Sequence, residues 1–163
     1  MDRAQENTPW EDLYRYWLDR HAAGKPPTRA EIDPMIDLHN LASNLILIDV
    51  LPGRFEYRLV GSHVVRHFGV DHTGKLVGTS GVDRTQLDAW SQTVAHVADT
   101  GKPFMLASHY PEAGRAKVIA LLLPLSTDGD GARKLFGATF FDQPFPDVTA
   151  YPGLPLKLVE LDI

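Results

Sequence analysis

The chain has 163 residues, of which 44% are hydrophobic and 23% are charged, a composition that suits one globular domain with a substantial core. Its formal net charge of −5 argues against non-specific nucleic-acid binding, which requires a basic surface. It contains no cysteine, which excludes disulfides, thiolate catalysis and zinc–cysteine sites. Its apolar runs are far shorter than the roughly 20 residues of a membrane span, and residues 1–7 hold no apolar signal core. We therefore expect a soluble cytoplasmic protein.

A first helix is predicted after Thr8, which can cap it, with Pro9 at its first position and Glu11 completing a capping box. Gly24 and the prolines after it end this segment. One face carries an apolar stripe at helical spacing, formed by Trp10, Leu13, Tyr14, Trp17 and Leu18. Burying such side chains contributes roughly 1.5–3 kcal/mol each, so the stripe must be covered by the chain's own sheet or by a second copy. We expect a homodimer built partly by this stripe.

Five strands are predicted, and they follow a brief helix near residues 34–40: Leu45–Leu51, Arg54–Gly61, Phe104–Tyr110, Lys117–Leu125 and Lys134–Phe141. Short connections make neighbouring strands antiparallel. The first, fourth and fifth are almost wholly apolar, which predicts central strands covered on both faces. The second and third mix polar and apolar residues, as edge strands do.

A short helix after Gly61 and a long helix capped by Asp83 and ended by Gly101 are predicted between the second and third strands. We expect this helical section on one face of the sheet and the first helix on the other. Four prolines after residue 142 predict a tail without regular structure, although residues 156–163 could form one extra strand. The chain thus divides into an N-terminal helical extension (1–41), a core (42–142) and a C-terminal tail (143–163).

This element order, two strands, several helices and then three strands, resembles that of PAS domains. The matching segments are Leu13–Trp17, Pro27–Pro34, Leu47–Val50, Tyr57–Ser62, Phe68-Gly69 with Thr73-Gly74, Gly101–Pro103 and Leu123–Ser126. Together they resemble the stand-alone bacterial PAS proteins found mainly in alphaproteobacteria. The resemblance implies an α+β PAS fold with a five-stranded antiparallel sheet, a sensory or regulatory role and no enzymatic activity. It leaves the cofactor unknown, because PAS domains bind haem, flavins, small metabolites or nothing known.

Residues 55–75 read as a strand, a glycine hinge, a short helix and a polar turn, an arrangement that can enclose a small pocket against a sheet. We expect a small molecule to bind between the sheet and residues 62–97. The candidate lining residues are Tyr57, Arg58, Phe68, His72, Trp90, Phe104 and Leu122.

Each polar candidate also has a structural interpretation. Arg58 could form an ion pair with Glu56 or Asp49, His72 could serve only the turn at 71–74, and the aromatic candidates could be plain core. His63 and His67 lie four residues apart, but no third ligand accompanies them, and we expect surface histidines and no metal site.

The sequence therefore predicts a non-enzymatic sensory domain that binds an unidentified small molecule and signals through an unidentified partner protein. One alternative is a pure protein-interaction module with a filled core. Another is a small cone-shaped α+β hydrolase or isomerase, which would need a polar pocket with a perturbed carboxylate or histidine. No Gly-x-Ser-x-Gly motif and no glycine-rich phosphate loop occurs.

Overall fold

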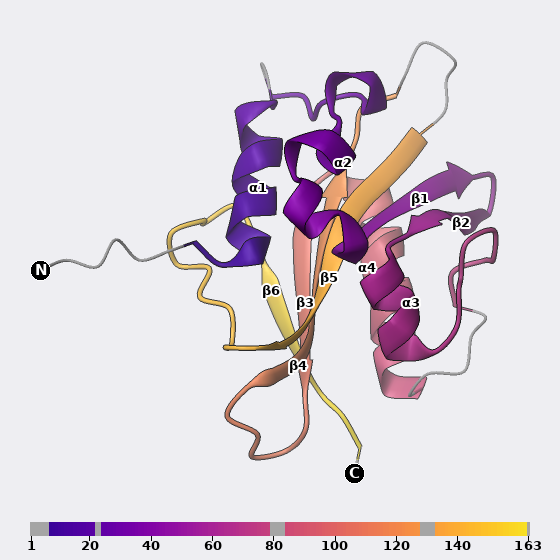
Figure 1. The fold of residues 1–163 in the computed structure, drawn as a ribbon. Coiled ribbons are helices and arrows are strands. Elements are labelled where there is room, and N and C mark those ends of the chain that lie inside the picture. The colour runs from indigo at the N-terminus through magenta and orange to yellow at the C-terminus, as the bar shows by residue number, and fades with distance from the viewer. Residues whose placement is uncertain (1–6, 22–23, 79–83, 128–132, 163) are drawn as a thin grey trace, which may run out of the picture.

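The computed structural model describes residues 7–21, 24–78, 84–127 and 133–162. A single sheet runs through the middle of the molecule (Figure 1), with strands β1 (Leu45–Leu51), β2 (Arg54–Val60), β3 (Phe104–His109), β4 (Ala116–Pro124), β5 (Arg133–Gln143) and β6 (Leu156–Glu160). The helices are α1 (Pro9–Asp19), α2 (Pro34–Asp37), α3 (Ser62–Phe68) and α4 (Arg84–Thr100), with the 3₁₀ turns η1 (Arg29–Glu31) and η2 (His39–Asn44). No helix in these ranges is long and apolar enough to cross a membrane.

The strands lie in the order β2-β1-β5-β4-β3-β6. As predicted, β1, β5 and β4 are central and β2 is at an edge. The prediction that β3 is the other edge is wrong, because β6 pairs with it in parallel and makes the sheet six-stranded and mixed. The optional extra strand of the tail is therefore present. Buried Leu154, Val159 and Leu161 anchor it, and the Leu161 amide donates to the His109 carbonyl at 2.7 Å.

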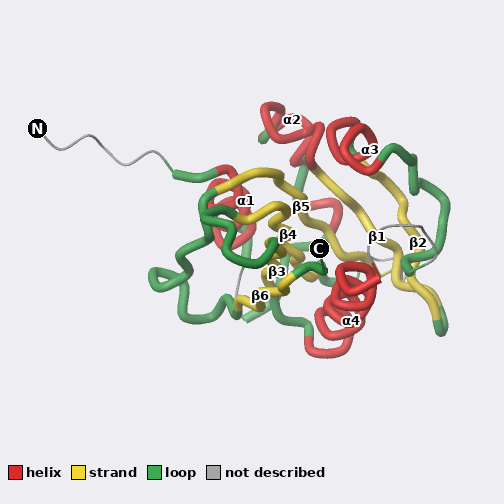
Figure 2. Tube along the Cα trace, turned by 90° about the horizontal axis from the view of Figure 1, so that it is seen from below, coloured by secondary structure: helices red, strands yellow, loops and turns green. Residues whose placement is uncertain are grey.

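Helix α1 covers one face of the sheet, and α4 lies on the opposite face (Figure 2). The capping box of Thr8 and Glu11 is present at the start of α1. The helix packs its aromatic stripe on side chains such as Leu121 and Phe136, and Trp17 Nε1 donates to the Pro124 carbonyl at 2.9 Å. The first helix is thus a cover on its own sheet.

Because α1 covers its own sheet, the apolar stripe that we expected at a dimer interface is buried within the chain. Trp10, Leu13, Tyr14 and Trp17 are each 3% exposed or less, and only Leu18, at 39%, faces outward. The burial follows from the alternation of β4 and β5, which presents bulky apolar side chains to the α1 face as well as to the α4 face. An interface made of these four side chains would require α1 to leave the sheet.

The C-terminal tail closes over α1. The Tyr151 ring lies edge-on to Trp10 and Tyr14, with centroids 5.7 and 5.2 Å away. Its hydroxyl accepts a hydrogen bond from Arg15 Nε at 2.8 Å and lies 3.0 Å from Glu11 Oε2. Helix, tail and sheet therefore share one hydrophobic core.

Candidate ligand-binding site

A step in side-chain size divides the α4 face of the sheet. Under the second half of α4 the contact is filled by bulky side chains, with Ile48, Leu122 and Leu135 packed against Val94 and Val97. Two residues earlier in β4 the side chains become smaller: Ala120 lies between Thr139 of β5 and Leu106 of β3, and before it Val118 pairs with Ser108. Since α4 continues over both regions, a gap opens beneath its first half.

This gap is a cavity that reaches the surface. The hollow with its open mouth encloses about 760 Å³, of which about 80 Å³ is open to the centres of water-sized spheres. One ordered water needs about 10–15 Å³ of such space, so several waters or a small organic molecule would fit. The lining residues come from all sides: Ile46, Tyr57, Val60, Val64, Phe68, His72, Leu76, Gly78, Gln86, Leu87, Trp90, Leu106, Ser108, Val118, Ala120 and Thr139.

Gly61 places α3 as one wall of the cavity. A Cβ atom at this position would lie 2.2 Å from the Ser43 carbonyl oxygen, so only glycine allows the chain to pass this close to η2. The Gly61 amide donates to the Leu45 carbonyl at 2.8 Å, which fixes the turn from β2 into α3. Helix α3 then presents Val64 and Phe68 to the cavity.

The segment after α3 closes the side next to β2. Backbone hydrogen bonds join Gly74 and Lys75 to Tyr57, at 2.7 and 3.0 Å, and so cover the outer edge of β2. The Thr73 amide donates to Asp71 Oδ1 at 2.9 Å, which forms the polar turn that the sequence predicted. This turn places the His72 ring, only 9% exposed, in the cavity wall. His72 is therefore both a residue of the polar turn and a lining residue of the cavity, the two roles that we considered for it.

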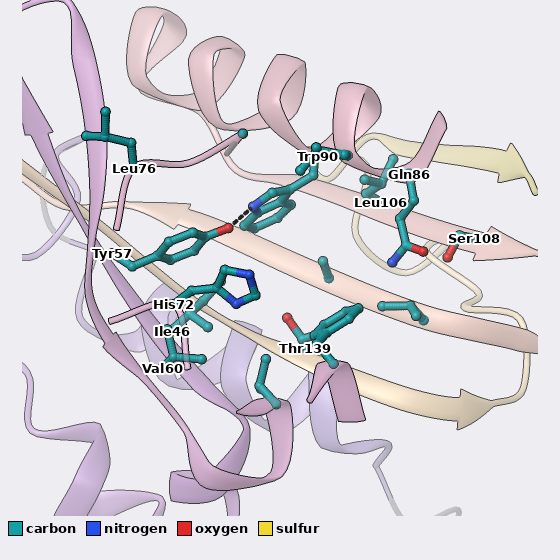
Figure 3. A pocket seen from close by; sticks show the side chains of 16 residues that line it. Ile46, Tyr57, Val60, His72, Leu76, Gln86, Trp90, Leu106, Ser108 and Thr139 are labelled. Atoms are coloured by element: carbon teal, nitrogen blue, oxygen red, sulfur yellow. Dashed lines mark hydrogen bonds between the residues drawn. The ribbon is translucent and has the colours of Figure 1, made fainter. Parts of the chain in front are cut away.

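Tyr57 and Trp90 form the polar contact at one end of the cavity (Figure 3). Trp90 Nε1 donates to the Tyr57 hydroxyl oxygen at 2.7 Å and thereby links β2 to α4. Burial raises the pKa of Tyr57 to about 12, although the hydrogen bond from Trp90 acts in the opposite direction. Burial also lowers the pKa of His72, with Lys75 adding to the effect and Asp71 opposing it. Both side chains are therefore predominantly neutral at pH 7.

Two buried hydroxyls lie along the rest of the cavity (Figure 3). Ser108, at the other end, is 3% exposed, and its Oγ has no hydrogen-bond partner among the described residues. The Thr139 hydroxyl points into the cavity from β5. An unsatisfied buried hydroxyl costs about 1–3 kcal/mol, so the Ser108 end of the cavity favours a hydrogen-bonding occupant.

Four of the seven predicted lining residues surround the cavity: Tyr57, Phe68, His72 and Trp90. Arg58 is exposed, because neighbouring residues of a strand point to opposite faces and Tyr57 already points inward. Neither Glu56 nor Asp49 forms an ion pair with Arg58 among the residues that the structure describes, and Asp49 instead pairs with Lys134.

Phe104 and Leu122 lie on the correct face of the sheet but not in the cavity wall. They pair with each other across β3 and β4 beneath the second half of α4, where the sheet and the helix are in full contact. They lie under the second half of α4, whereas the cavity lies under the first half. The strand pattern predicts which face a residue occupies but not which half of the helix lies over it.

Sequence reasoning missed the floor of the cavity and part of its rim: Gln86, Ser108, Ala120 and Thr139. Alternation within the predicted strand 117–125 places Ala120 on the same face as Leu122, so this residue could have been found. The predicted cap of α4, Asp83, lies outside the described residues.

The histidine pair on α3 has aromatic and amide neighbours. The His67 ring stacks on Phe141 with centroids 3.7 Å apart, and His63 Nδ1 lies 3.2 Å from Asn44 Nδ2. Among the residues that the structure describes, no group of three or more His, Cys, Asp or Glu side chains could hold a metal ion.

The model of the PAS domain family matches residues 5–140 of the chain, from just before α1 to within β5. The chain belongs to the PAS domain family. This confirms the PAS domain that the element order and segments indicated and the α+β class of the fold, whereas the narrower resemblance to stand-alone bacterial PAS proteins stays a prediction. Strand β6 and the whole tail lie outside the match. No curated protein matches the chain.

The decrease in side-chain size from Leu122 to Ala120 predicts that a larger side chain is tolerated at position 120. Ala120→Leu places its added atoms in the cavity, whereas Ala138→Leu must force the same atoms into the filled core under α1. We expect Ala138→Leu to lower the free energy of unfolding by about 1–3 kcal/mol and Ala120→Leu by clearly less. Urea unfolding of both variants measures this. Equal losses would show that the α4 face is as tightly packed as the α1 face.

The buried His72 predicts a pH-dependent loss of stability. Because its pKa is lowered in the folded state, the unfolded chain binds more protons as the pH falls through about 6.5, and stability decreases toward the folded-state pKa. We expect His72→Gln to remove this contribution. The free energy of unfolding of the variant should therefore decrease less than that of the wild type as the pH falls from 7.5 to 5.5. Unfolding at each pH, with NMR titration of the His72 ring, tests it. A His72 pKa above its ordinary value would contradict the burial argument.

Proposed function

We propose that this PAS domain is a non-enzymatic sensor that binds a small molecule between its sheet and α4. The observation that carries the proposal is the cavity itself: an apolar hollow into which a few polar groups point, among them the buried Ser108 hydroxyl, which has no partner among the described residues. Concave, mostly apolar sites with a few placed polar groups are typical of small-molecule binding. Membership of the PAS family supports a sensory or regulatory role.

The cavity also weighs against the alternatives. A pure interaction module would have a filled core, yet the space beneath the first half of α4 is open. A hydrolase or isomerase of the kind considered needs a perturbed carboxylate or histidine; His72 is such a histidine, but no Asp or Glu accompanies it among the described residues that line this cavity. His72 is the only His, Asp or Glu among the described lining residues.

We propose that the signal leaves through contact with a partner protein. The Tyr57–Trp90 hydrogen bond joins the cavity to α4, so a ligand that contacts Tyr57 also affects the position of that helix. The homodimer stays a prediction, and it would have to use surfaces other than the buried stripe of α1. Sedimentation velocity at high micromolar concentration tests it, and a purely monomeric chain would rule it out.

A thermal-shift screen of uncharged and charged metabolites tests the binding function. A ligand present at 100 times its dissociation constant stabilises the folded state by about 2.7 kcal/mol. We expect compounds that raise the unfolding temperature of the wild type and have much smaller effects on Ala120→Leu, whose side chain occupies the cavity. Hits that stabilise both proteins equally would bind elsewhere. The absence of any hit in a broad collection would contradict the proposal and favour the interaction module.

A further inference from the structure

The polar groups of the cavity restrict the chemistry of its ligand. We infer that the ligand is an uncharged carbonyl compound with an apolar body, such as a ketone, ester or lactone, whose oxygen accepts a hydrogen bond from Tyr57. This inference rests on the proposed binding function and specifies which chemical class the same cavity takes.

Among the described lining residues no side chain carries a fixed charge, and burial disfavours the charged form of His72. No Lys, Arg, Asp or Glu is among the described lining residues. A carboxylate or ammonium group placed there would lose its hydration and gain no opposite charge, which makes its burial unfavourable. The cavity therefore selects against ions, and its aliphatic walls favour an apolar body.

The Tyr57 hydroxyl is free to donate its proton in a hydrogen bond to a ligand. Its oxygen already accepts from Trp90 Nε1, and an indole N–H can only donate, so Trp90 cannot take the phenol proton. The described residues offer no other recorded acceptor for this proton. Burial keeps the phenol protonated, so this O–H is available to donate to an acceptor inside the cavity.

A carbonyl oxygen fits this position better than a group with its own proton. Ile46 and Val60 lie in the wall beside Tyr57 and provide no acceptor, so a ligand N–H or O–H directed at them would be unsatisfied (Figure 3). The acceptor nearest to this position is the neutral His72 ring, whose centroid lies 5.7 Å from that of Tyr57, so the comparison of 2-heptanone with 2-heptanol decides between a carbonyl and a hydroxyl. A carbonyl accepts the Tyr57 proton and brings no donor of its own. Ser108, at the opposite end, provides a second hydroxyl for ligands that carry another oxygen there.

Four probes with the same seven-carbon skeleton test the inference: 2-heptanone, 2-heptanol, heptanoate and heptylamine. Each is titrated into the ¹⁵N-labelled full chain, and the dissociation constant is taken from amide shift changes around the cavity. We expect 2-heptanone to bind most tightly, by at least about tenfold over the two ions. Tyr57→Phe should weaken 2-heptanone by roughly three- to tenfold, the contribution of one neutral hydrogen bond. Tyr110→Phe, which alters an exposed tyrosine of the loop after β3, is the matched control and should change nothing.

A measurement without substitution covers the case in which Tyr57→Phe fails to fold. The infrared C=O stretch of 2-heptanone bound to the wild type should fall below its value in hexane, because a donated hydrogen bond weakens the carbonyl bond. An unshifted stretch, or an affinity that Tyr57→Phe leaves unchanged, would overturn the inference.

The other outcomes separate this inference from the proposed function. Tighter binding of heptanoate or heptylamine, or equal binding of all four probes, would overturn the carbonyl class while leaving a ligand-binding cavity. Binding of none of the four would also overturn it. The sensor proposal would fall as well only if the broad screen found no compound whose effect Ala120→Leu abolishes.

Discussion

The whole arrangement depends on the packing of α4 on a sheet face whose side chains change in size along the strands. Ile48, Leu122 and Leu135 fill the space beneath one half of the helix, and Ala120 and Ser108 leave it open beneath the other. The filled half supplies the apolar burial that holds α4 on the sheet, and the open half supplies the cavity that we propose as the binding site. A site next to a well-packed contact keeps its shape, because the filled half fixes the distance between helix and sheet.

The opposite face of the sheet makes this division possible. There α1 and the C-terminal tail close a continuous core, held by the Trp17–Pro124 hydrogen bond and by the contacts of Tyr151. Because this core buries a large apolar area away from the cavity, the α4 face can tolerate unfilled space and the unpaired Ser108 hydroxyl. The tail lies outside the family match, and its strand β6 covers the edge of β3 that would otherwise be exposed.

The sequence allowed the fold to be predicted much further than the site. Apolar composition identified the central strands, and capping residues identified α1, because these signals are local. The pairing of β6 with β3 escaped firm prediction, since it depends on a contact some 50 residues apart in a proline-rich segment. Tyr57, Phe68, His72 and Trp90 were found as lining residues because aromatic side chains mark a sheet–helix interface. Arg58 could have been excluded by alternation alone, whereas Ser108 and Thr139 required the register between strands.

The account depends most on real empty space beneath the first half of α4. Crystals of the protein, refolded from denaturant to remove any bound compound and then pressurised with xenon, test this directly, since xenon enters apolar cavities. The account predicts xenon density between Ala120, Thr139 and Trp90, with the sheet and α4 unchanged. A structure in which α4 or its side chains fill this space, with no xenon bound there, would contradict it.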